Sequence, residues 1–146
     1  MRQDGGHGLS GRAAPALFLA LGLAVVPETG IAPASVSADL DGDGTAETVT
    51  AFPSRGGIRV QVSDARGRRI ADARAPSPGG DVVPFTLTTA PIGSAGALIE
   101  VTASTDASEC VSIWRLRDRT LARVPIRDAS GRELPDCEAP AWTWRW

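Results

Sequence analysis

The stretch SADLDGDGTAETVTAF places three carboxylates at alternate positions, at Asp39, Asp41 and Asp43. Gly44 follows them, and a fourth carboxylate, Glu47, stands just before an alternating apolar run. When the backbone curls, alternate aspartates bring several oxygen atoms around one point, which is the arrangement that a hard cation prefers. Without a cation, carboxylates this close repel one another and their pKa values rise. The spacing therefore predicts a cation site.

The predicted ligands follow the D-x-D-x-D-G pattern, in which the glycine allows a sharp turn. They are the side chains of Asp39, Asp41 and Asp43, the backbone carbonyl of Thr45 and the side chain of Glu47. A donor set of oxygen atoms alone favours Ca²⁺ over zinc or copper. An EF-hand also needs a bidentate glutamate at the twelfth position and flanking helices. Thr50 stands there in a strand-forming stretch, so the EF-hand pattern does not fit. The alternative that stays open is an acidic β-turn without a metal.

The only histidine, His7, lies in an N-terminal stretch with arginines, a short apolar run and an A-x-A sequence. These features are typical of a secretory signal peptide, and we expect it to span residues 1–34 and to be cleaved after Ala34 rather than after Ala38. The remaining domain, residues 35–146, would contain no histidine, which excludes His-dependent catalysis and His-ligated zinc. An uncleaved anchor or a buried first helix is the alternative.

Two cysteines, Cys110 and Cys137, make up the whole cysteine content. In an exported chain an even pair usually forms a disulfide, and a loop of this size would gain about 3–4 kcal/mol of stability. Two buried free thiols or a redox pair are the alternatives, although a redox pair normally has C-x-x-C spacing. The net charge of −2 predicts no nucleic-acid binding, so we expect Arg115, Arg117 and Arg119 to lie on solvated strand faces.

Short alternating runs rich in Val, Ile, Thr and Trp follow the leader, and Gly-, Pro- and Asp-containing turn signals separate them. This pattern predicts an all-β domain of antiparallel strands. The predicted strands cover residues 47–52, 58–63, 69–74, 82–89, 98–104, 111–117, 120–126 and 142–146. In the last of them Trp142, Trp144 and Trp146 share one face, which either closes the core or forms an exposed platform.

A faint internal repeat relates residues 47–74 to residues 98–124, with Val49 matched to Val101 and Val60 to Ile113. In the second copy the uncharged stretch PIGSAG takes the place of the acidic loop. Only the strand pattern is shared, and any two β-meanders can be matched in this way.

Residues 35–53, SVSADLDGDGTAETVTAFP, resemble the FG-GAP/VCBS type of repeat of integrin-like β-propellers and many secreted bacterial proteins. The resemblance implies a Ca²⁺ loop that runs directly into a strand. Two departures are Glu47, where the family usually has Asp, and residues 51–53, where it usually has Gly-Ala-Pro. A closed propeller has about four to eight blades. This chain has room for one clear repeat (about 35–74), a degenerate one (about 82–126) and the Trp-rich strand, so we expect antiparallel meanders of propeller-blade type, packed as two sheets without closing a propeller.

The expected function is that of a secreted or periplasmic, non-enzymatic β-module with a structural Ca²⁺ loop, which contacts an unidentified protein or a glycan. It would not span a membrane once the signal is removed, and oligomerisation would be a way to complete a larger β-structure. Two alternatives stay open. One is a small carboxylate-dependent glycan hydrolase, and the other is a structural envelope protein without a metal.

Overall fold

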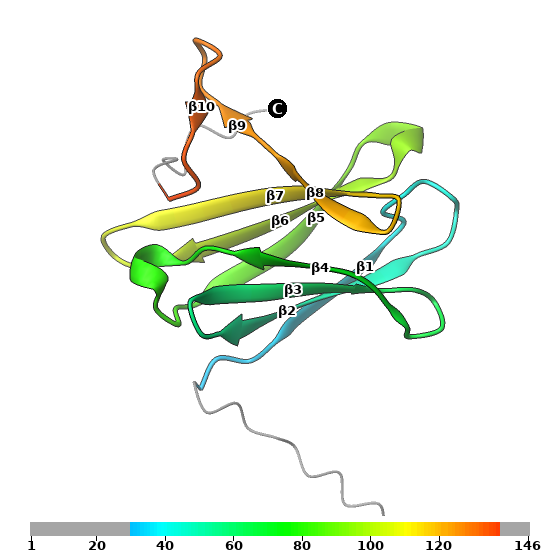
Figure 1. Ribbon diagram of the computed structural model, residues 1–146, viewed down its shortest axis with the longest axis horizontal. Helices are drawn as coiled ribbons and strands as arrows, with labels where there is room; N and C mark the ends of the chain where they lie inside the picture. The colour runs from blue at the N-terminus through cyan, green and yellow to red at the C-terminus, as the bar shows by residue number, and fades with distance from the viewer. Residues whose placement is uncertain (1–29, 138–146) are drawn as a thin grey trace, which may run out of the picture.

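The computed structural model describes residues 30–137, which form two four-stranded antiparallel sheets (Figure 1). The first sheet has the order β1 (Ala34–Ala38), β2 (Glu47–Ser54), β3 (Gly57–Ser63), β4 (Arg69–Ala75). The second has the order β5 (Phe85–Pro91), β6 (Ala97–Ser104), β7 (Glu109–Arg117), β8 (Thr120–Val124). The 3-10 turns η1 (Pro78–Gly80) and η2 (Gly93–Ala95) and a hairpin of β9 (Ile126–Arg127) and β10 (Glu133–Leu134) complete the described residues. The prediction of an all-β fold is confirmed, and among these residues the sheets close neither a barrel nor a propeller.

The two sheets pack face to face, with β1 lying over β5 and β4 over β8 (Figure 1). The strands follow the two-residue period of a half-buried sheet, because Glu47, Val49 and Ala51 in β2 are buried whereas the residues between them are partly exposed. One apolar core fills the space between the inner faces. Its fully buried members include Leu40, Val49, Val60 and Val62 from the first half of the chain and Ile99, Val101 and Ala103 from the second.

The two sheets have the same strand order, which is the order that the predicted internal repeat implies. Val49 and Val101, matched to each other, both lie in the core between the sheets. Val60 and Ile113 do not share a position, because Val60 faces this core and Ile113 packs on the outer face of the second sheet. Ala51 pairs with Val60, nine positions further on, whereas Ala103 pairs with Cys110, seven positions further on, so the register places Cys110 where the first sheet has Val60.

The outer face of the second sheet carries a smaller apolar cluster, in which Leu98 and Ile113 pack with Ile126. The predicted strand 120–126 is split, since Pro125 ends β8 and the chain turns into the β9–β10 hairpin. The returning chain is fastened to β7 by a hydrogen bond of 2.7 Å from the Val111 N–H to the Asp136 carbonyl. The predicted disulfide between Cys110 and Cys137 is present beside it.

One further strand was not predicted, and another begins later than expected. β1 was not predicted as a strand because its residues, ASVSA, overlap the expected cleavage region, yet all five of them pair with β2. β5 begins at Phe85 rather than at residue 82, after Pro84, which has no N–H to donate to a strand ladder. The expected signal peptide up to residue 29 and the predicted strand 142–146 lie outside the described residues.

Between residues 30 and 137, the structure contains no helix with the length and apolar character needed to cross a membrane.

We expect removal of the disulfide to destabilise the fold by about 3–4 kcal/mol, because the bond restricts the unfolded chain between two residues 27 positions apart. The double variant Cys110→Ser, Cys137→Ser should therefore melt more than about 10 °C below the wild-type protein in a calorimetric scan. A reductant should lower the melting temperature of the wild-type protein to the same value and leave that of the double variant unchanged. Equal melting temperatures for oxidised and reduced wild-type protein would contradict this assignment.

Candidate metal centre

The loop between β1 and β2 brings three carboxylates together. Asp39, Asp41 and Asp43 each offer an oxygen atom, and these atoms lie within 4.8 Å of one another. Asp39 is half-buried, whereas Asp41 and Asp43 are exposed. Clustered carboxylate oxygens suit Ca²⁺, which takes six to eight oxygen ligands, and the remaining ligands would come from backbone carbonyls and water. The three aspartates therefore form a group that could hold such an ion.

The shape of the loop is held by its own backbone. Each of the three carboxylates accepts a hydrogen bond from an N–H group further along the loop. The pairs are Asp39 with Gly42 and Gly44 (2.7 and 2.9 Å), Asp41 with Asp43 (3.1 Å) and Asp43 with Thr45 (2.6 Å). An ionised carboxylate has about four lone-pair sites, so these contacts leave acceptor capacity on each side chain for a cation.

Leu40 fastens the acidic loop to the rest of the molecule. Its side chain stands between two aspartates in sequence and is nevertheless fully buried in the core between the sheets. Its N–H donates to the Glu47 carboxylate at 2.9 Å, and its carbonyl accepts a hydrogen bond from the Ala97 N–H at 3.4 Å. Because Ala97 begins β6, this second contact ties the loop of the first sheet to the second sheet.

Glu47 has a supporting place in this arrangement. Its side chain faces the core and is only 4% exposed, and the group of three clustered carboxylates does not include it. Burial raises the pKa of Glu47, the hydrogen bond from the Leu40 N–H opposes that rise, and the charges of the three aspartates add to it. The role of Glu47 as a metal ligand stays a prediction, as does that of the Thr45 carbonyl.

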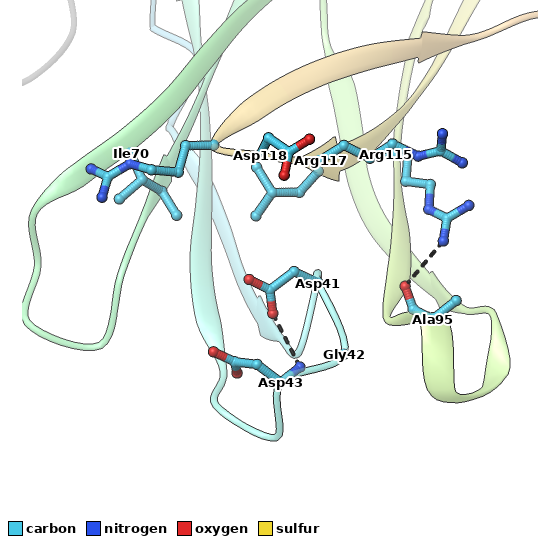
Figure 2. A pocket seen from close by; sticks show the side chains of 10 residues that line it. Asp41, Gly42, Asp43, Ile70, Ala95, Arg115, Arg117 and Asp118 are labelled. Carbon is cyan, nitrogen blue, oxygen red and sulfur yellow. Dashed lines mark hydrogen bonds between the residues drawn. The ribbon is translucent and has the colours of Figure 1, made fainter.

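A cavity of about 520 Å³ lies between the acidic loop and the hairpin that joins β7 to β8. Figure 2 shows Asp41 and Asp43 on one side of it and the end of β7, with Arg115, Arg117 and Asp118, on the other. Arg119 lines the cavity as well, so the three arginines expected on solvated strand faces lie opposite the acidic loop. Arg117 and Arg119 are exposed, as expected, although Arg119 lies in the turn after β7, and Arg115 is half-buried. The other lining residues are Gly42, Ile70, Ala95 and Leu116.

Two contributors to this site were not identified from the sequence. Leu40 is one, and the available signal was an apolar residue inside an otherwise acidic and glycine-rich stretch. The other is the β5–β6 connection, where Gly96 has a positive φ of 98° and where any Cβ atom would collide with the Leu40 carbonyl. Nothing local in PIGSAG indicates that a distant acidic loop packs against it.

Substitution of Gly96 tests this close packing. Gly96→Ala should destabilise the protein by about 3 kcal/mol or more, because the strained φ is added to a clash between backbones. Gly93→Ala is a matched control in the same connection, since Gly93 also has a positive φ but has nothing within 4 Å of an added Cβ. It should cost about 1 kcal/mol in urea unfolding. Equal losses for the two variants would show that the loops do not touch in solution.

The raised pKa of Glu47 predicts a pH dependence of stability. When the pKa of a carboxyl group is higher in the folded than in the unfolded state, the folded protein loses stability as the pH rises from the ordinary pKa through the raised one. For Glu47 the ordinary pKa is 4.5. Glu47→Gln keeps an acceptor for the Leu40 N–H but cannot ionise. In EDTA this variant should unfold at a higher temperature than wild type at pH 7, and the difference should shrink below pH 4.5.

Glu109→Gln, in the β6–β7 hairpin, is a control for loss of one negative charge elsewhere on the sandwich. A lower melting temperature for Glu47→Gln than for wild type at pH 7 would mean that the ionised side chain stabilises the fold.

Comparison of the chain with protein-family models, with curated proteins and with solved structures finds no match. The FG-GAP/VCBS resemblance therefore stays an expectation from residues 35–53.

Proposed function

We propose that this protein is a secreted, non-enzymatic β-module whose acidic loop binds Ca²⁺ as a structural ion and which contacts a protein or a glycan. The observation that carries the proposal is the gathering of the Asp39, Asp41 and Asp43 carboxylates within 4.8 Å on a loop whose centre is anchored in the core. An anchored loop presents its oxygen atoms together before the ion arrives, which lowers the entropic cost of binding.

The ion would act as a structural element because of where the loop is attached. Its residue Leu40 contacts both Glu47, at the start of β2, and Ala97, at the start of β6. Neutralising the three aspartates would remove their mutual repulsion and their unfavourable effect on Glu47. Extracellular modules can use dissociation constants of about 10⁻⁴–10⁻³ M, because calcium is plentiful outside the cell.

The placement of the carboxylates weighs against the hydrolase alternative. A glycosidase needs one carboxyl with a raised pKa beside a second carboxylate, both in contact with the sugar. Burial raises the pKa of Glu47, but its side chain is buried against a backbone N–H rather than open to a substrate. These observations support a binding module.

The disulfide supports the proposed secreted location, because disulfides persist in oxidising compartments. Cleavage after Ala34 would also leave four of the five β1 residues in the mature chain, whereas cleavage after Ala38 would remove the strand that borders β2.

Calcium removal tests the proposal directly. The purified protein should melt several degrees higher in a few millimolar Ca²⁺ than in EDTA, since a ligand at 100 times its dissociation constant contributes about 2.7 kcal/mol. The double variant Asp41→Asn, Asp43→Asn should lose this shift. Asparagine keeps a side-chain oxygen that can accept the loop hydrogen bonds, so the variant should still fold and should be at least as stable as wild type in EDTA.

Two controls separate specific binding from a general effect of charge. Mg²⁺ should give a smaller shift than Ca²⁺, because it demands a smaller, near-octahedral site. Asp106→Asn removes an exposed charge from the β6–β7 connection and should leave the calcium shift intact. If Ca²⁺ raises the melting temperature no more than Mg²⁺ does, the loop is an acidic turn and the proposal fails.

A further inference from the structure

The cavity between the acidic loop and the β7–β8 hairpin has a divided charge. Asp41 and Asp43 lie on the loop side, and Arg115, Arg117 and Arg119 belong to the hairpin side (Figure 2). A volume of about 520 Å³ is within the range of about 300–1,000 Å³ that is usual for small-molecule sites. The cavity can therefore accommodate a small ligand that presents groups of different charge to its two sides.

The arginines of this cavity have no carboxylate partner among the described residues. Of the twelve arginines within residues 30–137, five form ion pairs with aspartate or glutamate, and the three of the cavity are among the seven that do not. Within residues 30–137, no carboxylate forms an ion pair with Arg115, Arg117 or Arg119. Arg115 is half-buried, and one of its guanidinium N–H groups donates to the Ala95 carbonyl at 3.5 Å. Because a guanidinium has five N–H donors in a fixed fork, Arg115 is held in place and still has donors for an oxyanion.

A cation on the loop would change what the cavity attracts. Without it, the acidic and basic side chains that line the cavity are equal in number, since Asp118 at the hairpin tip adds a third negative charge. With a divalent ion among the aspartates, the cavity becomes positive overall. Water molecules often occupy some of the coordination positions of Ca²⁺, and a ligand oxyanion that takes the place of one and also reaches a guanidinium would satisfy both groups.

We propose that this cavity binds an acidic sugar, whose carboxylate or phosphate group is shared between the loop-bound Ca²⁺ and the arginines of the β7–β8 hairpin. This inference rests on the proposed calcium site and names the ligand class of the module. A sugar offers an oxyanion for the arginines and hydroxyl groups that can donate to Asp118. An acidic peptide side chain offers only the oxyanion, and a protein partner generally needs an open surface of about 800 Å² rather than a cavity.

Calorimetric titration of the purified protein tests the proposal with four probes, which are glucuronate, glucose 1-phosphate, glucose and the tripeptide Asp-Asp-Asp. We expect at least one of the two acidic sugars to bind in Ca²⁺, and we expect its affinity to fall tenfold or more in EDTA, within the usual range of coupling between two ligands. Glucose should bind at least tenfold more weakly, because it lacks the oxyanion. The first two probes distinguish a carboxylate from a phosphate as the preferred group.

The double variant Arg115→Gln, Arg117→Gln should weaken binding of the acidic sugar at least tenfold and keep the Ca²⁺-induced rise in melting temperature. Arg55→Gln is the matched control, since Arg55 is an exposed arginine in the β2–β3 turn, at the other end of β2 from the acidic loop. It should bind the acidic sugar as wild type does.

The outcomes separate the two proposals. A calcium-induced rise in melting temperature without binding of either acidic sugar overturns the ligand assignment and leaves the calcium site intact. Equal affinity in EDTA, equal affinity in the arginine variant, or tighter binding of glucose or the tripeptide also overturns it. Absence of the calcium-induced rise overturns the calcium site and this inference with it.

Discussion

Burial of Leu40 is the constraint on which the acidic end of this molecule depends. A residue between two aspartates would ordinarily be exposed with them, but this side chain enters the core between the sheets and none of it is accessible to solvent. Full burial of a leucine is worth about 1.5–3 kcal/mol. That free energy holds the aspartates at the surface on either side of it, because residues 39 and 41 must then lie close to the point where the chain enters the core.

The same residue explains why an acidic side chain is buried at position 47. Leu40 turns its backbone N–H inward with its side chain, and a buried N–H without an acceptor is costly. Glu47 supplies the acceptor at 2.9 Å, although burial and the neighbouring aspartates raise its pKa. Thus the Glu47 carboxylate accepts from the buried N–H group of the loop, and the three aspartates accept from its exposed N–H groups. Since these hydrogen bonds already fix its shape, a cation would act mainly on the charge of the loop.

The fold class was predictable because each strand has a local signature. Alternating runs between glycine and proline turns identified seven of the strands, and most boundaries were close. β1 was harder to predict as a strand, because its small residues also fit the pattern of a signal-peptide cleavage site. The match of Val60 to Ile113 failed because the second hairpin is two residues shorter between paired positions, which makes Cys110 the counterpart of Val60. Ile113 is three positions further on, and an odd shift reverses the face of a strand.

The candidate site was predictable only as far as it is local. The three aspartates meet because their spacing and the glycine between them determine the turn, and that information lies within a few residues. The arginines of β7 reach the same cavity through the packing of two sheets, and no local pattern carries that information. Gly96 is similar, since its missing side chain is explained only by the Leu40 carbonyl beside it.

The packing of the two sheets also accounts for the difference between the two loops. Because the sheets share a strand order and β1 lies over β5, the β1–β2 loop and the β5–β6 connection lie at the same end of the sandwich. The Ser94 carbonyl leaves no room for a side chain at Gly42, and the Leu40 carbonyl leaves none at Gly96. A second set of aspartates in this connection would face the first at short range and repel it. One acidic loop against one uncharged, glycine-containing loop is therefore the arrangement that lets both sheets close on a common core.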